Sequence, residues 1–288
     1  MINSLVLGFI GILPFVIVAS GLWMVYKTIH DRLTHYDDKA ELSAGNTAAG
    51  LARAGAYLGV GIAASGSLIG SNEPFWFDLL MFMIDGLVAI GVFTVASFVL
   101  DAVILRKIRN ADHIVAGNMA VAVLEASALV SLGIIMSAAF SGGGQNILAG
   151  LGSAVLYSFI GLATIALIYL AFCGLYRLVH KCVVEKEIKQ NNVGLASEAG
   201  GVLLGMSITL WFSISGDFTG WLNDFVSYAI AAGSSVLAVG VAWFLSGRLL
   251  TGVPSVKDGT HLGNVAIGVI KMFALMGFGL IAGLVTFS

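Results

Sequence analysis

Charged side chains inside otherwise apolar stretches are the residues of this chain best suited to chemistry. Four of them follow an asparagine by six or seven residues: Arg53 after Asn46, Glu125 after Asn118, Glu198 after Asn192 and Lys271 after Asn264. If these stretches cross a membrane, each charge costs a few kcal/mol or more unless it is paired or faces a polar path. We therefore expect two internal pairs, Arg53 with Glu125 and Glu198 with Lys271. A proton or ion relay is the functional interpretation, and a structural lock between neighbouring helices is the alternative.

Asp85 differs from these four because no basic residue occupies the equivalent place in the rest of the chain. It lies in the apolar run LLMFMIDGLVAIG. Such a carboxyl is either protonated or faces a polar cavity. A functional role and a place in a water-exposed outer vestibule, shared with Asp78, both remain open.

The four asparagines are expected to cap helices. Each stands directly before an apolar run and directly after a glycine or a second asparagine, at intervals of 72, 74 and 72 residues. Asparagine is a favoured N-cap residue, because its side chain satisfies amide donors that apolar surroundings leave bare. Lining an entrance is the alternative.

Motifs for cofactors, metals and catalysis are missing. The chain has no P-loop, dinucleotide fingerprint, HExxH motif or nucleophile elbow, so we expect no enzyme, no cofactor and no metal. Five histidines lie near the basic connections, at unequal distances from the asparagines: His30, His35, His113, His180 and His261. We expect interfacial polar residues there, with metal binding, haem binding or pH sensing as alternatives. Cys173 and Cys182 have no metal-binding spacing and are expected to be simple thiols.

Composition indicates an integral membrane protein. The chain is 58% hydrophobic and 10% charged, against roughly 45–50% and about 25% in soluble domains. A span needs ~20 apolar residues. We expect eight helical spans, at about 3–27, 47–70, 76–104, 115–140, 147–178, 193–215, 221–246 and 262–286.

Basic residues predict the orientation. Of fourteen lysines and arginines, twelve follow odd-numbered spans: Lys27, Arg32, Lys39, Arg106, Lys107, Arg109, Arg177, Lys181, Lys186, Lys189, Arg248 and Lys257. The positive-inside rule puts these connections in the cytoplasm and both termini outside. Anionic lipid or a cytoplasmic protein is a possible partner of this basic surface; nothing indicates nucleic acid.

The fourfold asparagine step predicts one two-helix unit used four times in parallel. We expect two four-helix halves, residues 1–143 and 144–288, related by a pseudo-twofold axis along the membrane normal. Such a chain corresponds to a fused dimer, and further homo-oligomers are possible.

The region around the first asparagine resembles a known family. Leu33, Thr34, Tyr36 and Asp37 match one element of its motif, and a second element matches at Gly45, Asn46, Ala48, Ala49, Ala54, Gly55, Gly59 and Ser65. The family is the YjfL-like bacterial inner-membrane family, catalogued as domain of unknown function 350. The resemblance implies four spans per domain, hence a tandem duplication here. It implies no settled activity, and gene context in the family points to envelope stress.

Two functions follow as expectations. The first is a small channel or transporter-like unit for protons, ions or a small solute, tuned by the intramembrane charges. The second is a non-conducting module for envelope maintenance that gathers lipid or a cytoplasmic partner.

Overall fold

The computed structural model describes residues 2–34, 37–104, 110–141, 147–215, 220–250 and 264–287, and within these ranges the chain forms helices and no strands. His35, His261, Arg106, Lys107, Arg109 and Lys257 lie outside the described residues. The long helices are α1 (Ile2–Leu33), α3 (Thr47–Ala64), α4 (Phe75–Ile104), α6 (Met119–Phe140), α7 (Ile147–His180), α9 (Val193–Ile214), α10 (Trp221–Leu249) and α11 (Val265–Phe287). Short helices α2 (Asp38–Ser43), α5 (Asn110–Val115) and α8 (Val184–Lys189) each precede an asparagine, and η1 (Ser65–Leu68) extends α3.

Seven of the described helices are long and apolar enough to cross a membrane, so this is a multi-pass membrane protein. The helix missing from this set is α3, within the second expected span, 47–70. It has only 18 residues, carries Arg53 and is rich in alanine and glycine. These features lower its hydropathy relative to the other long helices.

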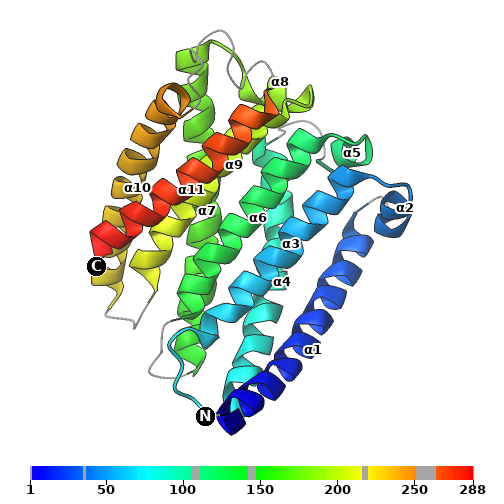
Figure 1. The fold of residues 1–288 in the computed structure, drawn as a ribbon, viewed down its shortest axis with the longest axis vertical. Helices are drawn as coiled ribbons and strands as arrows, with labels where there is room; N and C mark the ends of the chain where they lie inside the picture. The colour runs from blue at the N-terminus through cyan, green and yellow to red at the C-terminus, as the bar shows by residue number, and fades with distance from the viewer. Residues whose placement is uncertain are drawn as a thin grey trace.

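The helices that follow the asparagines form a row. α3, α6, α9 and α11 lie side by side in chain order (Figure 1), with α3 on α6, α6 on α9 and α9 on α11. The other long helices pack against this row: α4 on α3, α7 on α6, and α10 on both α9 and α11. α6 and α9 lie in the middle and are the most deeply buried candidate spans.

The order of the row corrects the expected twofold relation between the halves. A twofold axis would exchange α3 with α9 and α6 with α11, and no such axis maps the order α3, α6, α9, α11 onto itself. Stepwise repetition along the row accounts for this order instead. The sequence repeat defines the unit but not the symmetry operation that relates its copies.

Glycines bring the row helices into backbone contact. A methyl group at Gly133 of α6 would collide with the backbone of Gly59 on α3, and one at Gly279 of α11 would collide with Gly205 on α9. Gly200 of α9 packs equally closely on Ser127 of α6. Small residues allow this approach where no hydrophobic effect drives helix association in lipid. The two halves of the chain therefore touch where Gly200 of α9 meets the Ser127 side chain of α6.

Candidate functional site

All four asparagines cap a helix, as expected. Oδ1 of Asn46 accepts from the amides of Ala48 and Ala49. In the other three units, Oδ1 accepts from the amide three residues ahead: Val121 for Asn118, Leu195 for Asn192 and Ile267 for Asn264. The capping role assigned from the sequence is thus present in every unit.

Within the described residues, two of the asparagines also clasp the next unit, which here means that the side-chain amide donates to backbone carbonyls of that unit. Nδ2 of Asn46 donates to the carbonyl oxygens of Ile114 (2.9 Å) and Val115 (3.3 Å) at the end of α5. Nδ2 of Asn118 donates to those of Ile188 (3.1 Å) and Lys189 (3.1 Å) at the end of α8. Carbonyls in the last turn of a helix lack partners within the helix. The Ile114 and Ile188 carbonyls also accept from the amides of Gly117 and Asn191, so each clasp supplies the donor for the second carbonyl, that of Val115 or Lys189.

The expected contact between Glu198 and Lys271 is present. Nζ of Lys271 lies 3.0 Å from Oε1 of Glu198, and the two side chains are 8% and 0% exposed. The indole Nε1 of Trp243 donates to the same carboxylate oxygen. One charge is thus balanced by one opposite charge where α9, α10 and α11 meet, which is the arrangement of a structural lock.

Arg53 has a partner that the sequence did not indicate. Its Nε lies 2.5 Å from Oδ2 of Asp38, and both side chains are buried. Asp38 reaches it because Asp37 caps α2, accepting from the amide of Lys39, so that the short helix folds over the start of α3. Glu125, the expected partner, remains a close electrostatic neighbour of Arg53. The arginine therefore serves a cluster of carboxylates and not a single one.

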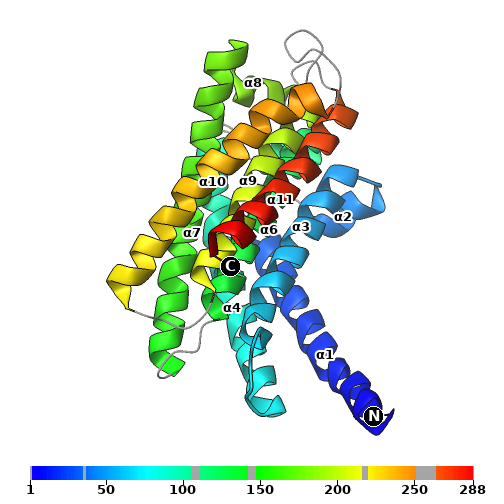
Figure 2. The same ribbon diagram turned by 60° about the vertical axis from the view of Figure 1, so that its left-hand side comes forward.

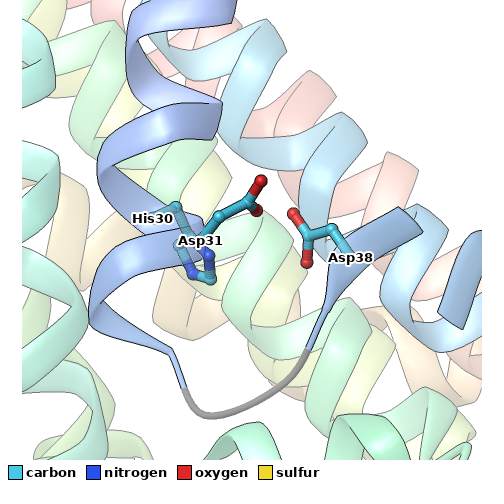
Figure 3. A group of neighbouring side chains, drawn as sticks. All are labelled: His30, Asp31 and Asp38. Atoms are coloured by element: carbon cyan, nitrogen blue, oxygen red, sulfur yellow. The ribbon is translucent and has the colours of Figure 1, made fainter. Parts of the chain in front are cut away.

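His30, Asp31 and Asp38 extend this cluster across α1 and α2. One potential ligand atom from each lies within 4.8 Å of the others, and Figure 3 shows the two carboxylates facing each other beside the imidazole. Oδ2 of Asp31 pairs with Lys27 at 2.6 Å. The Oδ1 atoms of both aspartates are buried and have no hydrogen-bond donor among the described residues.

Asp38 lies outside the candidate spans, and its environment favours binding a proton or a cation. Burial raises the pKa of the Asp38 carboxyl, the Arg53 guanidinium opposes that rise, and the Asp31 carboxylate adds to it. One histidine with two carboxylates is also a donor set that suits a divalent metal. However, Lys27 and Arg53 already neutralise one carboxylate each, so these three residues need no metal for charge balance.

A cavity with both polar and apolar lining residues adjoins the cluster. It has a volume of about 260 Å³ and is lined by Tyr26, His30, Leu33, Thr34, Thr94, Ser97, Phe98, Asp101 and Ala111. Asp101 accepts from the amide of Asn110 at 3.0 Å, and Glu125 lies near both Asp101 and Asn110. The cavity therefore reaches from His30 on one side to Asp101 on the other, and Glu125 lies near Asp101.

Asp85 lies apart from this cluster. It is 1% exposed, and its Oδ2 has no donor among the described residues. The Ser67 hydroxyl is its polar neighbour. This burial argues against an open outer vestibule, and Asp78 bonds Ser71 instead, at 2.6 Å. Asp85 precedes Asp101 by sixteen residues on α4, which corresponds to about 24 Å along a helix.

The remaining histidines and the cysteines do not form a site in the described part of the chain. His180 packs against Tyr176 with ring centroids 4.3 Å apart, far along the chain from His30. Burial lowers the pKa of His113, and the nearby Lys189 lowers it further. Cys173 and Cys182 form no disulfide within the described part of the chain.

The fold defines a multi-pass helical membrane protein built from repeated units. Comparison with known families then identifies the chain as a member of the Domain of Unknown Function (DUF350) family, whose model matches residues 4–140 and again residues 146–285. The resemblance to domain of unknown function 350 and its tandem arrangement are thereby confirmed, while the YjfL name stays an expectation from the sequence. The chain is also similar to the UPF0719 transmembrane protein of Aquifex aeolicus (strain VF5), with 28% identity over 205 residues, 69% of this chain and 72% of that protein. No solved structure matches.

Proposed function

We propose that the protein is a small permeation unit that takes up protons or small cations from the cytoplasmic side of the bacterial inner membrane. The observation that carries this proposal is the surplus of acid around Arg53. Asp31, Asp38, Asp101 and Glu125 gather within its electrostatic reach or beside the same cavity, and within the described part of the chain Lys27 is the second cation that pairs with this group. Buried carboxylates that crowd together stay charged only if a cation or proton joins them.

In this proposal α3 is an eighth span and each unit crosses the membrane twice in parallel. The ion pair with Asp38 supports it, because it neutralises the charge that lowers the hydropathy of α3. The end of the molecule that carries α2, α5 and α8 (Figure 1) also carries Lys39, Lys181, Lys186 and Lys189. We assign this end, here named the α2 end, to the cytoplasm, and both termini to the opposite side.

The route would run between the row and the helices packed on it. Contact between the row helices at Gly59 and Gly133 and at Ser127 and Gly200 leaves no room within the row. The cavity beside His30 instead opens between α1 and α4. Asp85, deep in α4 and without a cationic partner in the described chain, would be a second station on the way to the far side.

A non-conducting membrane module is the second candidate. The closed contact of Glu198, Lys271 and Trp243 and the asparagine clasps favour it, because they make a rigid frame with no unpaired charge. In that version the basic residues of the α2 end gather anionic lipid or a cytoplasmic protein, each worth about 1 kcal/mol in lipid attraction.

Flux in liposomes tests the proposal. The wild type is reconstituted and proton, potassium and chloride fluxes are measured beside Asp38→Asn, Glu125→Gln and Asp85→Asn. We expect cation or proton flux in the wild type and at least a fivefold loss in each variant that still elutes as a single species. Glu185→Gln is the matched control, since Glu185 pairs with Lys189 on the partly exposed face of α8 and should leave flux unchanged. A silent wild type contradicts permeation and favours the non-conducting module.

A further inference from the structure

The contacts within the row follow one register. The thirteenth residue after the asparagine of one unit meets the fifteenth after the asparagine of the next: Gly59 meets Gly133 between α3 and α6, and Gly205 meets Gly279 between α9 and α11. At both places a methyl group would collide with the facing backbone. Each row helix thus has a forward face, toward the next unit, and a backward face, toward the preceding one.

The forward face of α11 is open. Gly277, thirteen residues after Asn264, has nothing within 4 Å of an added methyl group. Phe273 and Ile281 on the same helix are 64% and 58% exposed. The residues at their positions in α6, Ser127 and Ile135, are 4% and 0% exposed. Gly200 of α9 packs on Ser127, and Gly161 of α7, the first helix of the next unit, packs on Ile135.

The backward face of α3 is open in the same way. Gly61, fifteen residues after Asn46, meets only a ring carbon of Trp23 at 3.9 Å, whereas its equivalent Gly133 touches the backbone of Gly59. Ala54 is exposed. Its equivalent Ala126 packs on Gly55 of the preceding unit.

The short helix α2 also has an exposed apolar side chain where its counterparts are buried. Because α2 lies outside the candidate spans, lipid chains are not expected to cover it. Leu42 is 48% exposed, while the residues at its position in the next two units, Ile114 and Ile188, are 1% and 0% exposed. α5 and α8 contact the row helix of the preceding unit, α3 and α6 respectively. α2 has no preceding unit in this chain.

α1 is incomplete as well. α4 packs on α3, and α7 packs on α6, so each contacts the row helix that precedes its own unit. No row helix precedes α1, and only 11% of its most apolar stretch is buried. Its first half meets α4 through Phe15 and diverges from the row toward the N-terminus (Figure 2).

We propose that a second copy of this chain occupies these faces, so that α11 of one copy packs on α3 and α1 of the next and continues the row. The internal register places Gly277 of one copy against Gly61 of the other, with Asn264 beside the last carbonyls of α2. The inference goes beyond the proposed function and does not depend on it. Since the two faces differ, the contact is heterologous, and it either closes into a ring or extends the row.

Disulfide cross-linking of the full-length protein in native membranes tests this contact. In a background with Cys173 and Cys182 replaced by alanine, Gly61→Cys and Gly277→Cys are made singly on differently tagged copies and co-expressed. Both positions have room for a side chain within one copy. The matched control pairs Gly61→Cys with Gly240→Cys, because Gly240 of α10 also has nothing within 4 Å.

We expect mild oxidation to link the two tagged copies at least fivefold more than the control pair, and each single variant alone to give little dimer. Adding Leu42→Asp should reduce the linked product severalfold, whereas Val183→Asp, at a similarly exposed residue before α8, should not. Equal yields from the test and control pairs would mean that lipid alone covers these faces and would overturn the proposal. Dimers of Gly277→Cys with itself would overturn the register by indicating a symmetric contact.

Discussion

The carboxylate of Asp38 pairs with the guanidinium of Arg53 through Oδ2 and faces the Asp31 carboxylate (Figure 3), while its Oδ1 is buried and finds no donor in the described chain. One side chain thus neutralises the charge within α3 and contributes to an acidic cluster at the α2 end. Substitutions at Asp38 and Asp31 can separate the contribution of the ion pair with Arg53 from that of the acidic cluster.

Asp38→Ala should destabilise the protein more than any single change at the rim of the cluster. It leaves Arg53 buried with one carboxylate fewer, a type of change that costs about 3–5 kcal/mol when a buried pair is broken. The measurement is the free energy of unfolding in detergent. Asp31→Asn is the control: the Asp31 carboxylate is 30% exposed and pairs with Lys27, which is 43% exposed, so its loss should cost about 1 kcal/mol or less. Equal losses would mean that Arg53 relies on its other neighbours.

The buried ion pair of Glu198 and Lys271 predicts that exchanging both charges restores part of the stability lost by exchanging one. Glu198→Lys and Lys271→Glu should each lower the thermal midpoint strongly, because each puts two like charges at a buried contact. The double exchange should recover part of the loss, measured by thermal unfolding of all three proteins. A double variant no more stable than the single ones would show that Trp243, which bonds the Glu198 carboxylate, requires the native orientation of the pair.

The clasp formed by Asn118 can be removed without removing the cap. Asn118→Asp keeps Oδ1 for the Val121 amide but replaces the amide that donates to Ile188 and Lys189. We expect a loss of about 1–3 kcal/mol in the free energy of unfolding, because the Lys189 carbonyl loses its donor and a charge is added, while the Ile188 carbonyl still accepts from the Asn191 amide. Asn264→Asp is the matched control, since in the described chain Asn264 only caps α11, and aspartate caps as well as asparagine. Similar losses of stability in both variants would show that the hydrogen bonds from Asn118 to Ile188 and Lys189 contribute little to folding.

Alkylation of Cys182 should depend on pH in an unusual range. Burial raises the pKa of the Cys182 thiol above its ordinary value of 9.0, and Glu187 raises it further. The thiolate is the reactive form, so at pH 7 labelling should be slower than for a free thiol. Its rate should still climb with each pH unit above 9. The measurement is the maleimide labelling rate in a Cys173→Ala background.

Two further outcomes can be read from the same labelling. Glu187→Gln should speed the reaction at a fixed pH below the thiol pKa, because it removes a charge that disfavours the thiolate. An impermeant maleimide should reach Cys182 in inside-out vesicles and not in right-side-out ones, if the α2 end faces the cytoplasm. Labelling from the opposite side would reverse the proposed orientation.

The long helices were predictable because runs of ~20 apolar residues have few other structures available to them in a bilayer. The Glu198 and Lys271 contact followed from opposite charges at matching depth in neighbouring units. The role of Asp38 was not predicted because α2 has only six residues, too few to show a helical periodicity. Two adjacent aspartates are also typical of an exposed polar loop, which gave no reason to expect a buried ion pair. The clasps were missed because the sequence identifies a capping asparagine but not the carbonyls that its amide reaches.

The asparagine clasps also have a mechanical consequence. Each joins the first turn of a row helix to the last turn of a short helix one unit ahead. α3 therefore cannot tilt without pulling α5, and α6 cannot tilt without pulling α8. These hydrogen bonds couple the first three units at the α2 end. A displacement of α3 should therefore be passed to the second unit through α5, and from there to the third unit through α6 and α8.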